Sequence, residues 1–435
     1  MSTSGTGAGG RYFHVAPVDE RTAAAARRHA YTSGRVIERD GRSLYAWGEA
    51  ARLVLPLGTA DTKAVGEIAD QLQAVLPLDG LEGERAPGPT RSPRPWPVAV
   101  GALAFDPAGW SELVVPRVAV LVDNGGARAI AVGSREELAS ARRAFPFAGG
   151  PPQHGPAEAP ERFELASVRS HEDFRRRVGQ ALEAIRSGRI DKVVLAREVV
   201  ATANRPFRQE QLLERLRSLH PSCCTFAVDG FVGASPELLV RRQGLEVLSQ
   251  PLAGTVARSG DPDEDRRLAG ALLGSEKERA EHRVVVQAIL AGLGPLCTGL
   301  DVPEAPRLLA LRNVAHLATP VRGTLSTSTG GAPSALELAA ALHPTPAVGG
   351  WPREDALDYL RKSEEIDRGR YAGPVGYVGA DGDGEWWIGI RSAIVEGRRA
   401  RLLAGVGIVA GSDPAAELAE TQLKLQAMLA AAVRP

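Results

Sequence analysis

Cysteine is scarce in this chain, and its charges cancel. The 435 residues include 3 cysteines, and 52 basic side chains balance 52 acidic ones. Three cysteines cannot all pair within one chain, and the absence of a C-x-x-C pair argues against a zinc ribbon. A net charge of zero gives no electrostatic reason to expect nucleic acid as a partner. We therefore expect a reduced, cytoplasmic protein.

Long apolar runs are missing as well. No segment approaches the roughly 18 apolar residues that span a bilayer, so no membrane association is expected. The first ten residues are rich in Ser, Gly and Thr, lack the apolar region of a secretory signal and are predicted to be disordered. The chain has no P-loop, and no G-x-G-x-x-G motif lies between a strand and a helix, which disfavours a dinucleotide site.

The remaining composition is typical of a globular protein, with 44% hydrophobic and 24% charged residues. Helical and strand-like segments mix without regular alternation, which favours an α+β fold with largely antiparallel sheets. Helices are predicted at 62–76, 171–187, 206–219, 263–293 and 414–433. Strands are predicted at 98–105, 112–122, 190–200, 225–232, 238–247, 371–378, 385–395 and 401–409.

Two pairs of glutamates are spaced three residues apart on predicted helices. Glu278 and Glu281 share a face that continues into apolar residues, and Glu417 and Glu420 share a face that continues through Lys424. Such inward-pointing carboxylates would supply the oxygen ligands that Mg²⁺ prefers. The alternative is a solvated helix face in which each glutamate pairs with a nearby basic residue.

Two other residues suit acid–base chemistry. Lys192 lies in an apolar strand, where desolvation would lower the pKa of a lysine general base; the alternative is a strand-edge lysine that extends to water. Glu237 follows a strand and precedes apolar residues. Its pKa would be raised, as a general acid requires; the alternative is an exposed turn residue.

Glycine-rich segments and one arginine suit the binding of an anion. Gly254 with Thr255, and Gly405, lie in glycine-rich segments whose backbone N–H groups are accessible to a substrate. Arg391 is placed in a predicted strand and would suit a bidentate carboxylate contact, or else a structural ion pair. His316 and a second histidine, at position 343, lie in apolar settings that are more typical of core histidines.

Together these segments resemble the chorismate-utilising enzymes, which include the anthranilate, aminodeoxychorismate, salicylate and isochorismate synthases. This resemblance implies two large, mainly antiparallel sheets packed face to face, with helices outside and the site in a cleft. It covers 171–429, and its motifs occur in the family order: Lys192–Arg197, Gly233–Glu237, Pro251–Thr255, Ser275–His282, His316–Pro320, His343–Pro346, Asp367–Gly376, Ile390–Arg391, Gly405–Val409 and Glu417–Lys424.

The resemblance also implies a role for each candidate residue. The lysine matching Lys192 activates water, and the glutamate matching Glu237 protonates the departing C4 hydroxyl. Four glutamates form the implied Mg²⁺ site. Glu281 and Glu420 hold the ion, and Glu278 and Glu417 lie behind them and act through waters. The residues implied to bind or lie beside the substrate are Gly254, Thr255, His316, Arg391, Gly405 and Lys424.

Within this family the sequence favours isochorismate synthase. Ala253 stands where aminodeoxychorismate synthases with a lysine nucleophile carry Lys, and Lys192 is present where ammonia-using anthranilate synthases generally lack the base. The segment His343–Gly350 is similar to isochorismate synthases rather than to salicylate synthases. The predicted activity is a Mg²⁺-dependent interconversion of chorismate and isochorismate for siderophore, menaquinone or salicylate biosynthesis. The alternatives are a salicylate synthase and a non-catalytic relative that acts as a binding protein.

We expect one compact domain, in which residues 11–160 form the N-terminal part and residues 161–435 form the chorismate-binding catalytic region. The Pro/Gly-rich stretch 149–160 is therefore not predicted to be a true linker. A monomer or weak dimer is expected, without an obligatory glutaminase subunit.

Overall fold

A computed structural model describes residues 11–39, 41–56, 58–77, 97–141, 159–327 and 331–433. The predicted disorder of residues 1–10 lies outside these ranges, as do nearly all of the Pro/Gly-rich stretch 149–160 and part of the predicted domain 11–160. Within the described residues, no helix is long and apolar enough to cross a membrane. The three cysteines are free thiols.

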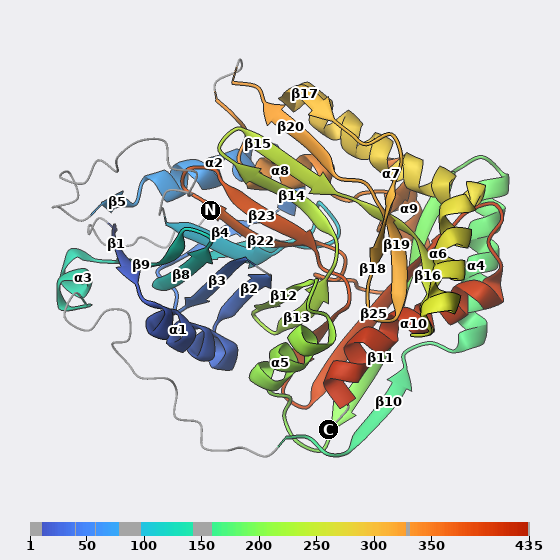
Figure 1. Cartoon of the computed structure of the whole chain (residues 1–435), viewed down its shortest axis with the longest axis horizontal. Helices are drawn as coiled ribbons and strands as arrows, with labels where there is room; N and C mark the ends of the chain where they lie inside the picture. Colours follow the sequence, from blue (N-terminus) through green and yellow to red (C-terminus); the bar gives the residue numbers. More distant parts are fainter. Residues whose placement is uncertain are drawn as a thin grey trace.

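The frame of the molecule is a pair of large sheets (Figure 1). All strand pairs in them are antiparallel except the parallel pair at one edge of the larger sheet. The larger sheet has 13 strands, in the spatial order β10 (Phe163–Ser167), β11 (Lys192–Ala203), β25 (Arg399–Ile408), β24 (Ser392–Glu396), β13 (Phe231–Ser235), β12 (Cys224–Val228), β2 (Arg35–Arg39), β3 (Arg42–Trp47), β8 (Val118–Asp123), β9 (Gly126–Gly133), β1 (Tyr12–Val18) and β5 (Leu76–Pro77), with β21 (Gly350–Trp351) paired to β11.

The second large sheet has nine strands, and a third, small sheet has three. The nine-stranded sheet runs in the order β17 (Cys297–Asp301), β20 (Val321–Leu325), β15 (Glu246–Gln250), β14 (Leu238–Gln243), β23 (Gly384–Ile388), β22 (Pro374–Gly379), β6 (Val98–Ala102), β7 (Ser111–Val115) and β4 (Ala51–Leu55). The small sheet consists of β16 (Leu252–Ala257), β19 (Val314–Ala318) and β18 (Arg307–Ala310).

The two large sheets pack face to face through an apolar layer. Ile37 and Phe226 from the larger sheet and Val100 and Trp387 from the second sheet belong to one buried cluster. Helices cover the outer faces: α1, α4, α5 and α10 lie on the larger sheet, and α2 and α8 lie on the second. The fold class predicted from sequence is confirmed, with the small third sheet as an addition.

Four of the five predicted helices match single helices among the described residues, and four further helices were not predicted. The helix bounds are α1 (Glu20–Ser33), α2 (Thr62–Gln73), α3 (Arg135–Ala141), α4 (His171–Arg186), α5 (Gln209–Leu219), α6 (Pro262–Gly274), α7 (Glu276–Leu293), α8 (Ala335–Leu342), α9 (Arg353–Ser363) and α10 (Pro414–Val433), with short 3₁₀ turns at Gly58–Ala60 and Gly294–Leu296. Helix α10 begins at the predicted residue, and Asp413 caps it by accepting hydrogen bonds from the Ala415 and Ala416 N–H groups.

The predicted helix 263–293 is wrong as a single element. Ser275 has extended backbone angles and ends α6. Its hydroxyl accepts a hydrogen bond from the Glu278 backbone N–H and so caps the start of α7. Helical periodicity on both sides concealed a break that a single N-cap serine produces.

Four predicted strands are each two strands in the structure, separated by turns. The segment 225–232 is a hairpin in which Asp229 and Gly230 both have positive φ, and 238–247 turns at Gly244. The segment 112–122 divides into β7 and β8, and 385–395 divides into β23 and β24. Each of these segments holds a Pro or Gly at or next to its turn, but the apolar and β-branched residues on both sides made it resemble one continuous strand.

Candidate active site

The residues singled out in the sequence lie around one pocket, with an empty volume of about 960 Å³ that includes space open to solvent. Strands β16, β19 and β25 and helices α7 and α10 surround it, on the right of Figure 1. Eleven of the twelve candidate residues line this pocket: Glu237, Gly254, Thr255, Glu278, Glu281, His316, Arg391, Gly405, Glu417, Glu420 and Lys424. The twelfth, Lys192, reaches it through a contact with Glu281.

Lys192 is the first residue of β11 and is only 4% exposed, so it does not extend to water. Its Nζ donates to Glu281 Oε1 at 2.7 Å. Burial raises the pKa of Glu281, but the Lys192 charge and hydrogen bond outweigh it and leave this pKa lowered. The structure therefore adds an ion-pair partner that the sequence did not indicate.

Side chains complete the edge of the strand that carries Lys192. Strands β21 and β10 pair with the two ends of one edge of β11, and the middle of this edge has no neighbouring strand. The buried pair Glu364–Arg368 fills this gap. Glu364 Oε1 accepts the Ala196 N–H at 2.7 Å, and Arg368 Nη2 donates to the Val194 carbonyl at 2.5 Å. A buried charged pair of this kind is stable only when its remaining hydrogen bonds are made, as they are here.

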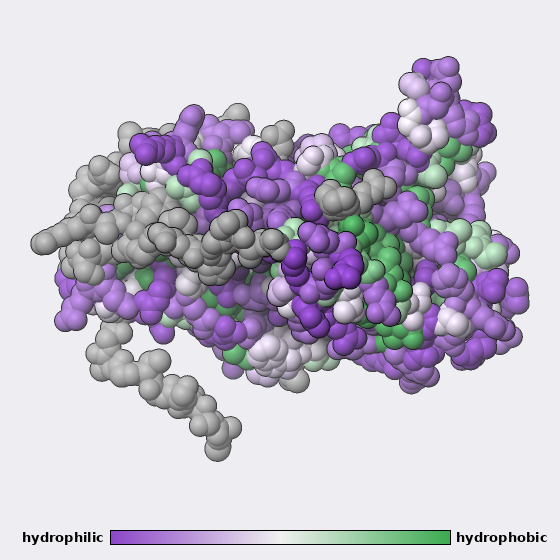
Figure 2. Space-filling view, turned by 90° about the horizontal axis from the view of Figure 1, so that it is seen from below, coloured by the Kyte–Doolittle hydropathy of each residue, from purple (hydrophilic) through white to green (hydrophobic). Residues whose placement is uncertain are grey.

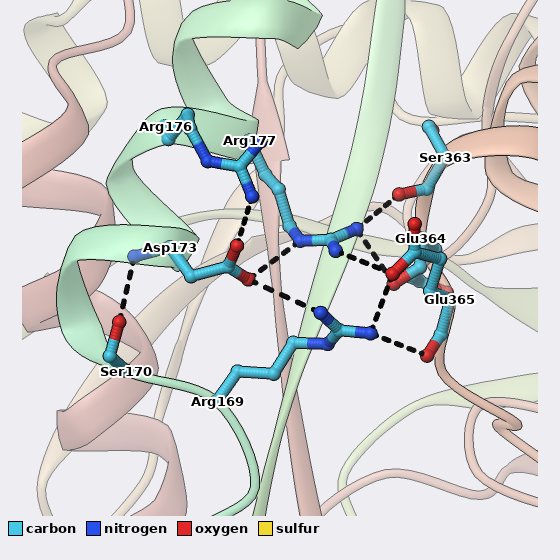
Figure 3. A network of polar contacts seen from close by, with 8 residues as sticks. All are labelled: Arg169, Ser170, Asp173, Arg176, Arg177, Ser363, Glu364 and Glu365. Carbon is cyan, nitrogen blue, oxygen red and sulfur yellow. Dashed lines mark hydrogen bonds and ion pairs between the residues drawn. The ribbon is translucent and has the colours of Figure 1, made fainter.

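A polar network docks α4 against the chain segment that carries this pair (Figure 3). Arg177 donates to Asp173 on its own helix and to the carbonyls of Ser363 and Glu364 at the end of α9. Arg169 and Arg177 also hold the Glu365 carboxylate. The network fixes the end of α9 and thereby Glu364.

Glu237 lies between β13 and β14 and is 4% exposed. Its backbone N–H donates to Ser235 Oγ at 3.2 Å, and its carbonyl accepts from the Ile388 N–H. Burial raises the pKa of Glu237 to about 7, against the lowering effects of a backbone hydrogen bond and of Lys192, Lys424 and Arg391. This carboxyl group is thus not an exposed turn residue, and it exchanges a proton near neutral pH.

The four helix glutamates gather at the pocket wall. The pKa values of Glu278 and Glu417 are raised, first by burial and then by the charges of neighbouring glutamates. Val285 and Ile289, further along α7, are buried in the core, so the acidic stripe points inward as its apolar continuation predicted. Carboxylates that burial and mutual repulsion destabilise are favourable partners for a cation.

The donor chemistry fits a Mg²⁺ ion with an incomplete protein shell. No three His, Cys, Asp or Glu side chains of the described residues are arranged to hold a metal ion by themselves. Mg²⁺ typically uses one or two protein carboxylates and takes its other oxygens from water and substrate. Glu281 and Glu420 line the pocket and have neighbouring carboxylates, so the residues present fit such an ion.

The prediction that Arg391 lies in a strand is wrong. This residue sits between β23 and β24 with a positive φ of 52°, a conformation that ordinary side chains rarely adopt. Its Nη2 donates to His316 Nε2 at 2.9 Å, and His316 Nδ1 lies 3.1 Å from the Gly254 carbonyl. Burial, followed by the Arg391 charge, lowers the pKa of His316 to about 3, so the imidazole is neutral, with its proton on Nδ1.

The Arg391 guanidinium is buried, and it forms no ion pair with any of the described side chains, which disfavours the structural ion-pair alternative. A buried cation that lines a pocket without a carboxylate partner suits an anionic ligand. Gly254 and Thr255 lie next to the same histidine, because Thr255 Oγ1 is 3.2 Å from His316 Nδ1. Arginine, histidine and the irregular part of β16 at Gly254 form one connected wall.

Lys424 connects α10 to β25. Its Nζ donates to the Gly405 carbonyl at 3.0 Å and pairs with Glu420 Oε1 at 2.8 Å. The pairing alternative raised for Glu420 is therefore present in the structure, although the pair lies at the pocket and not on a fully solvated face.

Several pocket residues were not singled out from the sequence. Tyr371 is buried beside Gly405, whose backbone N–H hydrogen-bonds to it, and burial raises the pKa of this phenol to about 12. Arg368 and Tyr371 both fall in or next to the Asp367–Gly376 motif, which was the available signal. His343, read as a core histidine, is buried and hydrogen-bonded to the Phe105 carbonyl.

Residues 112–433 match the family described as Chorismate binding enzyme. This match extends over more than half of the chain, and the chain therefore belongs to the chorismate-binding enzyme family. The buried acid, the paired lysine and the glutamate cluster all lie within the matched region.

Individual relatives agree with this assignment. The chain is 37% identical over 387 residues to isochorismate synthase DhbC of Bacillus subtilis, covering 85% of this chain and 90% of the relative. It is 46% identical over 270 residues to the salicylate biosynthesis isochorismate synthase of Pseudomonas aeruginosa, over 60% of this chain but only 55% of that protein. A solved structure of MenF, the menaquinone-specific isochorismate synthase of Escherichia coli, matches with a TM-score of 0.78 and 25% identity, over 97% of this chain and 95% of MenF.

Proposed function

We propose that the protein is an isochorismate synthase that interconverts chorismate and isochorismate with Mg²⁺. The observation that carries this proposal is the buried Glu237, whose pKa of about 7 suits a general acid at neutral pH. Relatives with the same printed activity support the reaction. The isomerisation adds water at ring carbon C2 and expels the hydroxyl at C4, so it needs one acid and one base at the same ring.

The residues divide into an acid, a base and a carboxylate-binding set. Glu237 gives its proton to the departing C4 hydroxyl, and Lys192, once neutral, takes a proton from the water that attacks C2. Arg391 and Lys424 bind the carboxylate groups of chorismate, while Gly254 and Thr255 lie beside the ring. Tyr371 adds a hydroxyl near Gly405 in the same wall.

Glu281 and Glu420 would hold Mg²⁺, with Glu278 and Glu417 acting through waters. Bound there, Mg²⁺ would neutralise the ring carboxylate and would stabilise the charge that shifts in the diene. The pKa values of Glu278 and Glu417 are raised by burial and then by the charges of Glu281 and Glu420. This supports a cation in this position, because it would offset both effects.

The test is an incubation of purified protein with chorismate and Mg²⁺, without an ammonia source, followed by chromatography against standards. A mixture of chorismate and isochorismate at equilibrium is the expected result. Salicylate with pyruvate would show a salicylate synthase instead. Unchanged chorismate with a folded protein would favour a binding protein or an enzyme that needs an amine-donor partner.

A further inference from the structure

Two of the four pocket glutamates already carry a cation supplied by the protein. Lys192 Nζ lies 2.7 Å from Glu281 Oε1, and Lys424 Nζ lies 2.8 Å from Glu420 Oε1. The other two are differently placed. Glu278 has its nearest lysine nitrogen, from the half-exposed Lys277, at 3.9 Å, and Glu417 forms no ion pair with any described residue. The lysines therefore occupy the two glutamates proposed as direct metal ligands.

The Lys192–Glu281 contact is largely shielded from solvent. The lysine side chain is 4% exposed and the glutamate side chain 16%. The backbone of Gly407 lies against both, since a Cβ there would be 3.0 Å from Glu281 Oε1 and 3.0 Å from Lys192 Cε. A second cation on Glu281 would therefore lie close to the ammonium with little water to screen their repulsion.

We propose that Lys192 is an internal counter-ion that competes with a divalent cation for Glu281, so that metal binding separates Lys192 Nζ from this carboxylate. Lys424 has the same relation to Glu420. This inference rests on the Mg²⁺ site proposed above.

The competition also concerns the base role proposed for Lys192. In the structure its Nζ donates to Glu281 Oε1 at 2.7 Å, so this nitrogen is directed at the carboxylate. A cation that takes the place of Lys192 on Glu281 would release the nitrogen toward the pocket.

The decisive experiment measures Mn²⁺ binding to the full chain without chorismate, from the electron paramagnetic resonance signal of free hydrated Mn²⁺. Lys192→Met keeps the length of the side chain and removes its charge, and it should bind Mn²⁺ at least about tenfold more tightly than the wild type because a like charge is gone. Lys192→Arg keeps the charge and should not bind more tightly. Lys63→Met is the matched control, because Lys63 is 87% exposed on α2, away from the pocket.

A second measurement guards against loss of folding. Lys192→Met leaves Glu281 without its partner, so its Tm should be lower without metal and should rise more on Mn²⁺ addition than that of the wild type. If the variant does not fold without metal, Lys424→Met tests the same relation at the more exposed Glu420, again with tighter Mn²⁺ binding expected.

The outcomes separate this inference from the proposed function. Equal or weaker Mn²⁺ binding by both charge-removing variants, with clear binding by the wild type, would overturn the competition and leave the metal site standing. A wild type that converts chorismate but binds no Mn²⁺ would remove the metal site and the competition together, while the isomerase activity would remain.

Discussion

At the scale of single residues, Glu237 carries the sharpest expectation. Replacing it by Gln keeps the shape and removes the proton donor, so kcat should fall by about 10²–10⁴-fold, the usual contribution of a general acid. In the wild type, kcat/KM should decline as the pH rises through about 7, because the acid form is lost. Steady-state kinetics from pH 5.5 to 8.5 measure both effects, and circular dichroism checks the fold. A variant with near-wild-type kcat would exclude the acid role.

The same residue should leave a signature in stability. In the folded protein its pKa of about 7 lies above the ordinary 4.5. The contribution of its protonated carboxyl to the free energy of unfolding is therefore fully present below pH 4.5 and is lost as the pH rises through 7. This corresponds to about 3 kcal/mol. Between pH 5 and pH 8, Glu237→Gln should therefore gain about that much relative to the wild type in urea unfolding. A constant difference between the two proteins would contradict the raised pKa.

Arg391 should act on substrate binding, because its guanidinium is buried at the pocket without a carboxylate partner. Arg391→Lys keeps the charge but loses the planar pair of donors, so KM for chorismate should rise about tenfold or more. Arg370, whose guanidinium donates to the Val228 and Asp229 carbonyls and does not line the pocket, offers a matched Arg→Lys control. An unchanged KM in Arg391→Lys would argue against a carboxylate-binding role.

At the scale of elements, the N-cap of α7 should make a measurable contribution to stability. Ser275→Ala removes the N-cap of the helix that carries Glu278 and Glu281, and should lower the free energy of unfolding by about 1 kcal/mol. It should also weaken Mn²⁺ binding, because that helix would begin less firmly. Ser170→Ala removes the equivalent cap of α4 and should cost similar stability without affecting metal. Equal Mn²⁺ binding by both variants would show that the cap is purely structural.

The sequence predicted elements better than their boundaries. Helix α10 was placed correctly because Asp413 and Pro414 are explicit start signals, and the inward glutamates of α7 were recognised because the stripe continues into Val285 and Ile289. The turns inside 225–232 and 385–395 were missed although Asp229-Gly230 and Gly389 are turn signals, because apolar strand residues on both sides make each segment resemble a single strand. The positive φ of Arg391 has no sequence signal in a non-glycine residue.

The pocket was predictable as a set of residues but not as a set of contacts. The resemblance selected Lys192, Glu237 and the four glutamates individually. The pairing of Lys192 with Glu281 joins residues 89 positions apart, and no local pattern encodes such a contact. Glu364 was overlooked for the same reason, since its partners on β11 are about 170 positions earlier.

At the scale of the whole molecule, the N-terminal strands are built into both large sheets. Strands β2 and β6 contribute to the apolar layer between the sheets, and Arg39 pairs with the buried Glu385 of β23 at 3.3 Å. We therefore expect that residues 159–435 expressed alone will not fold into a chorismate-binding unit. Size-exclusion chromatography and thermal unfolding provide the check. A fragment that unfolds cooperatively near the full-length Tm would show instead that residues 11–160 are a separable domain.

Gly407 offers a way to uncouple binding from turnover. Its bare Cα leaves room for both side chains, because an added methyl group would lie 3.0 Å from Lys192 Cε and 3.0 Å from Glu281 Oε1 and would crowd the proposed base and a proposed metal ligand. Arg391 and His316, in the wall proposed to bind the substrate, belong to other elements and would keep their positions. A Gly407→Ala protein should thus be a slow enzyme that still retains its substrate, which would make it a suitable vehicle for capturing unreacted chorismate in a crystal.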